Sequence, residues 1–282
     1  MPELPEVETV RRGLAQRFIG RRLAGLALNR ADLRRPLPKG LAPLVEGRRV
    51  ERIERRAKYL LIHLEGGGVL LIHLGMSGRL IIVEAPQAGT ETAAAGPHDH
   101  VVFRFDDGSA LRFNDARRFG SLDYVADATL AEAHPRLRHL GPEPLGNSFS
   151  GPVLAASLAG KATPLKAALL DQRVVAGLGN IYVSESLYWA GLSPRRQAAT
   201  VKGERAERLA AAIRSVLERA ITAGGSSLRD YVQTSGELGY FQHQWAVYGK
   251  EGEPCPACDC RIHIRRIVQS GRSTFYCARR QR

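Results

Sequence analysis

The spacing of apolar residues changes twice along the chain, and this limits the possible folds more than any other feature. Val7, Val10, Leu14 and Phe18 recur at the spacing of one helix, which we expect to end near Gly20. From there to about residue 125 the apolar residues form short runs, and beyond residue 152 helical spacing returns. This order predicts an α+β fold, and the length of 282 residues favours two domains.

Two pairs of short apolar runs predict β-hairpins. Residues 59–64 and 69–74 flank a Glu-Gly-Gly-Gly turn, and residues 101–105 and 110–113 flank an Asp-Asp-Gly turn. We therefore expect an N-terminal helix followed by an antiparallel β-sandwich. Residues 84–97 interrupt the pattern and predict an excursion between strands.

The second part of the chain begins after a segment rich in proline and glycine, residues 127–152, which we interpret as a connection. Helices are predicted over residues 165–170, 181–189 and 201–221, the last of them stopping at Gly224-Gly225. The expected divisions of the chain are therefore 1–126, 127–152, 153–244 and 245–282.

The charge balance indicates the kind of partner. Forty-one Lys and Arg residues against 28 Asp and Glu residues leave a formal charge of +13, which favours a polyanion such as nucleic acid. An arginine-rich proteome would give the same excess, so charge by itself does not identify the partner. No apolar run approaches the roughly 20 residues of a membrane-spanning helix. The acidic, proline-bearing start is unlike a signal peptide, so we expect a cytoplasmic protein.

All four cysteines lie close together near the C-terminal end. A secreted disulfide framework would normally spread its cysteines through the chain, whereas a cluster in a cytoplasmic protein is typical of metal ligands. Thiolates at such spacing favour Zn²⁺. The candidate ligands are Cys255, Cys258, Cys260 and Cys277.

The first residues offer a nucleophile. Removal of Met1 would leave Pro2 with a free secondary amine, which can attack a carbon that bears a leaving group and form an iminium. Glu3 lies beside it and can serve as a general acid. Taken alone, however, Pro and Glu here are also what an ordinary helix start favours.

The segment Met1–Glu8 closely resembles the start of bacterial formamidopyrimidine-DNA glycosylase. Leu4, in Pro-Glu-Leu-Pro, favours this branch over the related endonuclease VIII branch, which acts on oxidised pyrimidines. The resemblance implies a helix–two-turn–helix in the second domain and a C-terminal zinc-finger β-hairpin. Further similar segments follow in the family's order at residues 56–60, 73–78, 98–101, 115–120, 177–182 and 271–277.

The resemblance implies a bifunctional base-excision-repair enzyme that removes 8-oxoguanine and formamidopyrimidines from duplex DNA and then cleaves the strand. Pro2 would attack C1′ and Glu3 would help to open the deoxyribose ring. The family assigns β-elimination to the position of Lys58 and δ-elimination to that of Arg272. Two alternatives remain: a glycosylase for pyrimidine lesions, and a non-catalytic zinc-finger DNA-binding protein, which would be expected to lack Pro2, Glu3 or Lys58.

The resemblance also implies contacts with DNA. Met76, Arg117 and Phe119 match side chains that the family inserts where the base has left the duplex, and Met and Phe suit such a wedge. We expect Asn180 to cap a helix whose N-terminus binds phosphate. Other expected contributors are His98 and Lys161 as DNA contacts, Glu185 as a residue that shapes the site, and segment 224–241 as a loop that closes over the base.

The cysteine pattern departs from the family, whose zinc finger usually ends in Cys-x-x-Cys. Here Arg280 occupies the expected position of the last ligand, and Cys260 fits the second ligand better than Cys258 does. We therefore expect Cys258 to act as a substitute ligand, so that Cys255, Cys258, Cys260 and Cys277 hold one structural Zn²⁺. The alternative is a three-thiolate or metal-free finger. The family also implies a monomer without a small-molecule cofactor, in the bacterial cytoplasm and associated with the nucleoid when bound to DNA.

Overall fold

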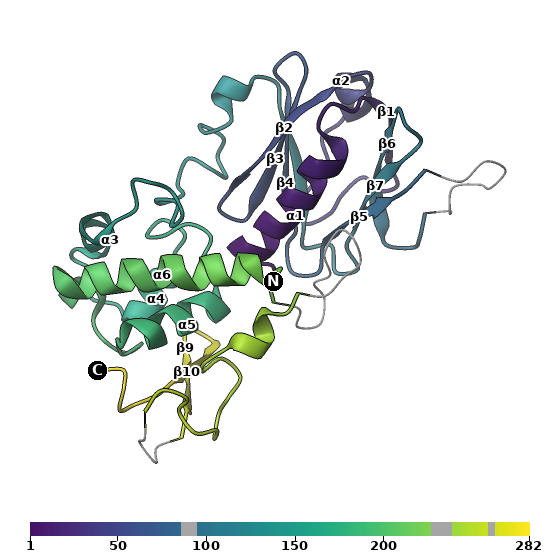
Figure 1. Ribbon diagram of the computed structural model, residues 1–282. Helices are drawn as coiled ribbons and strands as arrows, with labels where there is room; N and C mark the ends of the chain where they lie inside the picture. The colour runs from purple at the N-terminus through teal and green to yellow at the C-terminus, as the bar shows by residue number, and fades with distance from the viewer. Residues whose placement is uncertain (86–94, 227–238, 259–262) are drawn as a thin grey trace. The chain divides into compact units, whose positions relative to one another are not determined.

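The computed structural model describes residues 1–85, 95–226, 239–258 and 263–282 and divides the chain into two compact units (Figure 1). Unit 1 comprises Met1–Arg138 together with Gly224–Tyr240, and unit 2 comprises His139–Ala223 together with Phe241–Arg282. Unit 1 contains two antiparallel sheets, and unit 2 is mostly helical. The expected α+β class is thereby confirmed.

Unit 1 begins with helix α1 (Leu4–Phe18), followed by eight strands in two four-stranded sheets and the short helices α2 (Leu41–Val45) and η1 (Ala128–Leu130). The first sheet has the order β2-β3-β4-β8, with strands Val50–Arg56, Tyr59–Leu64, Val69–His73 and Ser121–Val125. The second sheet has the order β1-β6-β7-β5, with strands Leu23–Leu28, Asp99–Phe105, Ala110–Asn114 and Arg79–Val83.

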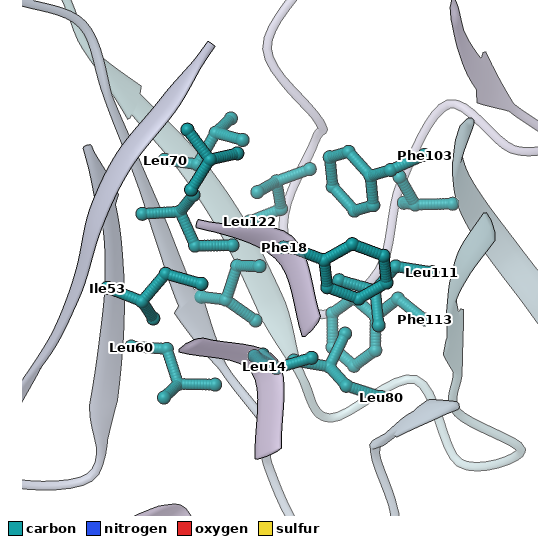
Figure 2. Packing of buried hydrophobic residues seen from close by; sticks show 14 of the residues in the cluster. Leu14, Phe18, Ile53, Leu60, Leu70, Leu80, Phe103, Leu111, Phe113 and Leu122 are labelled. Carbon is teal, nitrogen blue, oxygen red and sulfur yellow. The ribbon is translucent and has the colours of Figure 1, made fainter. Parts of the chain in front are cut away.

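The core of unit 1 forms where α1 meets both sheets. Phe18 stacks on Phe105 with ring centroids 4.1 Å apart. Burial of such side chains is the main stabilising term, since a fully buried Leu or Phe contributes about 1.5–3 kcal/mol. Figure 2 shows the cluster, to which α1 contributes Leu14 and Phe18, the first sheet Ile53, Leu60, Leu70 and Leu122, and the second sheet Leu80, Phe103, Leu111 and Phe113.

Both predicted hairpins are confirmed. Strands β3 and β4 pair with Leu61 opposite Leu71, and β6 and β7 pair with Phe103 opposite Leu111. The predicted excursion lies between β5 and β6, and its residues 86–94 lie outside the described residues.

Unit 2 consists of the helices α3 (Gly151–Leu158), α4 (Leu165–Leu170), α5 (Asn180–Ala190) and α6 (Glu204–Thr222), with the short helices η2 (Ala198–Thr200) and η3 (Phe241–Gln244). The predicted helices correspond to α4, α5 and α6. Helix α5 packs against α4 and α6, which explains why nearly all of its residues are buried. Acidic residues in the first turn of α6 and Arg219 in its last turn complement the helix dipole.

The cysteine-bearing tail forms a hairpin of β9 (Arg265–Gln269) and β10 (Arg272–Tyr276). Ser270 and Gly271 both have positive φ, 48° and 71°, as a tight two-residue turn requires. Phe275 of β10 packs against a small buried cluster that includes Tyr188, Ile264 and Cys277. Among the described residues, no helix is both long and apolar enough to cross a bilayer.

Candidate active site and nucleic-acid interface

The start of α1 holds the candidate nucleophile and acid. Pro2 is buried, and Glu3 is only 3% exposed and occupies the N-cap of α1. The backbone N–H of Glu3 donates to Oε2 of Glu6 at 2.8 Å, as in a capping box. This bond fixes the direction in which the chain enters the helix, so Pro2 and Glu3 have a defined place.

Lys58 lies in the two-residue turn between β2 and β3 and is 5% exposed. Its neighbour Ala57 has φ +53°, a conformation that a residue with a Cβ adopts only under strain. Arg55 braces the turn, because its Nη1 donates to the carbonyl of Ala57 at 2.9 Å while its Nε lies 3.2 Å from Oε2 of Glu8. Helix α1 therefore supports the turn that carries Lys58.

His73, at the end of β4, lies opposite Tyr59 in the sheet. Its Nδ1 accepts a hydrogen bond of 3.0 Å from the backbone N–H of Gly75. Burial lowers the pKa of His73 to about 4, and the positive charge of Lys58 acts in the same direction. The imidazole is thus neutral at neutral pH, with the proton on Nε2. The sequence motif contained His73, but we assigned it no role.

Met76, Arg117 and Phe119 form one exposed group, as the wedge interpretation requires. Met76 is 38% exposed and Phe119 is 40% exposed, both high values for large apolar side chains. The guanidinium carbon of Arg117 lies 5.0 Å from the ring centroid of Phe119. The backbone N–H of Arg117 donates to Oγ of Ser77 at 3.3 Å, which joins the segment that carries Met76. His98 is also exposed.

In unit 2, Asn180 is the first residue of α5, and Gly179 is the N-cap. The expectation that Asn180 caps this helix is therefore wrong. The extended backbone of Gly179 takes the cap position, so the Asn180 side chain reaches across to the tail instead. Its Nδ2 donates to the carbonyl of Ser273 at 3.0 Å and to the hydroxyl of Tyr248 at 3.3 Å.

Arg272 is exposed at the first position of β10, next to the residue that Asn180 binds. A fully buried lysine holds this strand in place, because Nζ of Lys166 donates to the carbonyl of Ser273 and to Oγ1 of Thr274, both at 2.7 Å. Asn180 and Arg272, which are far apart in the sequence, are thus neighbours in the structure. Lys166 lies within the predicted helix 165–170, and we assigned it no role from the sequence. Lys161 is half-buried before α4.

Glu185 is fully buried in α5 and organises the segment that contains Tyr248. Its carboxylate accepts hydrogen bonds from the backbone N–H groups of Ala246, Val247 and Tyr248 at 2.8–2.9 Å. Burial raises the pKa of Glu185, and the three N–H donors act in the opposite direction.

The Sγ atoms of Cys255, Cys258 and Cys277 lie within 4.8 Å of one another, and those of Cys258 and Cys277 are 3.7 Å apart. Cys255 and Cys277 are free thiols, whereas Cys258 is disulfide-bonded in this structure. The three converging sulfur atoms would fit a zinc site if that disulfide were reduced. Cys260 lies outside the described residues, as do residues 227–238 of the expected loop 224–241.

Arg280 interacts with both the backbone and the ring of Tyr188. Its Nε donates to the carbonyl of Tyr188 at 3.2 Å, and its guanidinium carbon lies 4.9 Å from the ring centroid. The hydroxyl of the same tyrosine lies 3.4 Å from Sγ of Cys255. Arg280 is therefore held by stacking and hydrogen bonding.

Three family models match the chain in succession. They are the formamidopyrimidine-DNA glycosylase N-terminal domain over residues 1–122, the H2TH domain of the same enzyme over residues 140–232, and a zinc finger found in FPG and IleRS over residues 252–279. The formamidopyrimidine-DNA glycosylase of Rhodospirillum centenum is 59% identical over all of both chains.

Solved structures agree with the sequence comparisons. The MutM (Fpg) protein of Thermus thermophilus is 43% identical, with a TM-score of 0.86 over 99% of this chain and 98% of that one. Lactococcus lactis Fpg, in complex with DNA that contains N7-benzyl-Fapy-dG, is 32% identical, with a TM-score of 0.87 over all of both chains.

The fold, the site and these similarities define a DNA glycosylase of base excision repair with abasic-site lyase activity. The chain belongs to the formamidopyrimidine-DNA glycosylase family. It is of the Fpg type and not of the endonuclease VIII type, which removes both alternatives left open by the sequence.

Proposed function

We propose that this enzyme excises oxidised purines, 8-oxoguanine and formamidopyrimidines, from duplex DNA through a covalent intermediate on Pro2. The observation that carries the proposal is the buried Pro2-Glu3 start of α1, in a chain that family models match over residues 1–122, 140–232 and 252–279. The complex of Lactococcus lactis Fpg with modified Fapy-dG DNA supports the substrate class.

The first chemical step uses the secondary amine that removal of Met1 frees. The nitrogen of Pro2 attacks C1′, and the bond from C1′ to the base nitrogen breaks as the base leaves with a proton. Glu3 donates a proton to O4′ as the bond between C1′ and O4′ opens, which leaves an iminium on C1′. The capping bond between Glu3 and Glu6 keeps the acid at the start of the helix.

Strand cleavage follows because the iminium acidifies the C2′ hydrogen. Loss of that proton expels the 3′ phosphate, and a second elimination expels the 5′ phosphate before water releases Pro2. We assign Lys58 to the first elimination and Arg272 to the second, where their charges also bind the departing phosphates. Asn180, bound next to Arg272, contributes an amide to the same backbone.

The exposed group of Met76, Arg117 and Phe119 fills the gap that the extruded base leaves. Unstacking a base pair costs about a few kcal/mol, which wedged side chains offset. The guanidinium of Arg117 can hydrogen-bond to the base that has lost its partner. His98 and Lys161 are assigned to backbone contacts, and Glu185 to shaping the site.

Borohydride trapping on a duplex that contains 8-oxoguanine tests the covalent step. Reduction of the iminium should link the wild-type enzyme permanently to the DNA, and a variant with an extra residue before Pro2 should form no adduct, because its Pro2 nitrogen is part of a peptide bond. Pro5→Ala is a matched control, since it changes a buried proline of the same helix start that has no nucleophilic amine.

An adduct that persists in this extended variant would assign the nucleophile elsewhere. Wild-type enzyme that forms no adduct with any oxidised base would contradict the proposed reaction altogether. The extended variant is decisive because it keeps the Pro2 side chain but removes its free amine.

We further propose that one structural Zn²⁺ is held by Cys255, Cys258, Cys260 and Cys277. The converging sulfur atoms of the three described cysteines support this ligand set, which requires the disulfide of Cys258 to be reduced. The interaction of Arg280 with Tyr188 is in keeping with a role outside the set. Bound zinc would supply folding stability to the tail that carries Arg272.

Elemental analysis should find one zinc per chain in the wild type and in Arg280→Ala, and less in Cys260→Ser. Folded wild-type protein without zinc would overturn the metal assignment. Loss of zinc in Arg280→Ala would contradict the proposed ligand set.

We also infer a monomer that acts on double-stranded DNA in the bacterial cytoplasm and associates with the nucleoid when bound. The net charge of +13 supports the DNA partner, and the bacterial relatives support the bacterial setting. Light scattering during size exclusion tests the oligomeric state, and imaging of a fluorescent fusion with and without oxidative damage tests the location.

A further inference from the structure

Asp115 is fully buried directly after β7, and its carboxylate joins two segments far apart in the sequence. Oδ1 accepts a hydrogen bond of 2.6 Å from the hydroxyl of Ser77, next to Met76. Oδ2 accepts one of 2.7 Å from the backbone N–H of Gly120, next to Phe119. The carboxylate therefore lies between the two segments that carry the wedge.

The backbone of Asp115 reaches a third segment. Its N–H donates to the carbonyl of His98 at 3.0 Å. Its carbonyl lies 2.9 Å from Nε2 of His100, which must be the donor because a carbonyl only accepts. Segments 75–78, 98–100 and 115–120 are thus joined through one residue, and we call this arrangement the Asp115 junction.

The segments are also in close backbone contact. Gly75 has φ +64°, and a Cβ there would overlap the backbone of Phe119. A Cβ at Gly120 would come within 2.6 Å of the ring of Phe113. With so little free space, neither segment can shift by much without the other.

We propose that Asp115 is a positioning residue for base extrusion, which holds Met76, His98, Arg117 and Phe119 as one rigid block against the duplex. The inference rests on the proposed function, because it explains how the wedge of that site works. Asp115 does not need to contact these four side chains, because it fixes the backbone segments that carry them.

Rigidity matters because the wedge has to separate stacked bases, at a cost of about a few kcal/mol. A loosely held side chain would move away before the stack opened. A carboxylate suits this place because both donors require an acceptor and each oxygen serves one of them. Asparagine can still accept from Gly120 and donate to the Ser77 oxygen, so it should restore part of the function.

The test compares Asp115→Ala with Asp107→Ala as a matched control. Asp107 also accepts from a serine, through Ser109 N at 3.0 Å, but lies at the opposite end of β7. Loss of the buried acceptor should lower single-turnover excision of 8-oxoguanine from duplex DNA by about 10- to 100-fold. Cleavage of single-stranded DNA at an abasic site requires no wedge and should match that of Asp107→Ala. Asp115→Asn should recover part of the duplex activity.

Equal losses on duplex and single-stranded DNA in Asp115→Ala would overturn the proposal, as would duplex excision no lower than in Asp107→Ala. Amide hydrogen exchange gives a readout that is independent of activity. Segments 75–78, 98–100 and 115–120 should all exchange faster in Asp115→Ala but not in Asp107→Ala, and unchanged exchange in these segments would overturn the junction.

Two further measurements separate a failure of the Asp115 inference from misfolding of the variant and from a failure of the proposed function. If Asp115→Ala does not fold, Ser77→Ala removes one donor to Asp115 together with the acceptor of the Arg117 N–H, leaves the bond from Gly120 in place, and should show a smaller loss of the same kind. Equal effects on both DNA substrates would again overturn the proposal. A wild type without excision or lyase activity would contradict the proposed function, and the exchange experiment would then still decide whether Asp115 holds the three segments together.

Discussion

The carboxylate of Glu6 accepts a hydrogen bond of 2.8 Å from the backbone N–H of Ser226, a residue 220 positions further along the chain. Its other oxygen accepts from the N–H of Glu3, so one buried side chain joins the candidate catalytic acid to the returning segment of unit 1. Gly225 fits this contact because its φ is +81° and a Cβ would lie 3.0 Å from Oε1 of Glu6.

Replacing Glu6 with alanine should destabilise the protein by about 2–5 kcal/mol, because two buried N–H groups lose their acceptor. Glu6→Gln should lose less, since its amide oxygen can still accept one of the two bonds. Urea denaturation measures the difference, with the exposed Glu132→Ala as the control. Equal stability of Glu6→Ala and Glu132→Ala would contradict the role of Glu6.

Acid should weaken the fold through His73. Its pKa is lowered from 6.5 to about 4 by burial and nearby cations, so between these values the unfolded chain takes up a proton that the folded chain excludes. The free energy of unfolding should therefore decrease as the pH falls from 6.5 to 4, by at most about 3 kcal/mol. Above pH 6.5 this contribution is fully present.

Urea denaturation of the wild type and His73→Gln at a series of pH values tests this expectation. The variant should lose less stability over the acidic window, because the group that resists protonation is gone. Parallel curves for the two proteins would show that other groups cause the acid sensitivity.

DNA affinity should fall steeply with salt, because each phosphate that the protein neutralises contributes about −0.9 to the slope of log affinity against log salt. Arg272→Ala should make this slope shallower by about one contact. Arg208→Ala is the control, since Arg208 is an exposed arginine paired with Glu204 on α6. Fluorescence anisotropy with undamaged duplex gives both slopes, and identical slopes would remove Arg272 from the phosphate contacts.

Lys166→Met should loosen β10, because hydrogen bonds to a charged donor contribute about 1.5–3 kcal/mol each. Thr274→Val should cause a smaller loss. In the double variant, two apolar side chains would face each other without an unsatisfied polar group, so its loss should be less than the sum of the two. Thermal unfolding measures all three variants, and strictly additive losses would argue against direct coupling of Lys166 and Thr274.

The elements that the sequence predicted correctly depend on local patterns. The hairpins at Glu65–Gly68 and Asp106–Gly108 have turn residues between short apolar runs, and α6 ends at a glycine pair. Helix α3 was missed because its first residues, Gly151 and Pro152, were interpreted as part of a connection. Those residues are also compatible with a helix start, since Pro is favoured in the first turn.

The functional side chains also divide into those that a local motif revealed and those whose role depends on tertiary contacts. Pro2, Lys58, Met76 and Arg272 could be proposed because each lies in a short motif whose order along the chain resembles one family. The residues that hold them could not be recognised so easily. Asp115 and Ser77 lay inside quoted motifs, yet their hydrogen bond spans 38 positions, and no spacing rule predicts such a contact.

The sequence by itself determined the fold class, the family and the candidates for chemistry, because helical and strand periodicity, turn residues and motifs are properties of neighbouring residues. Only the tertiary structure decided that β8 pairs with β4, that Gly179 and not Asn180 caps α5, and that Glu6 binds Ser226. The physical reason is that a buried donor or acceptor needs some partner, while packing of the whole chain selects which distant partner it finds.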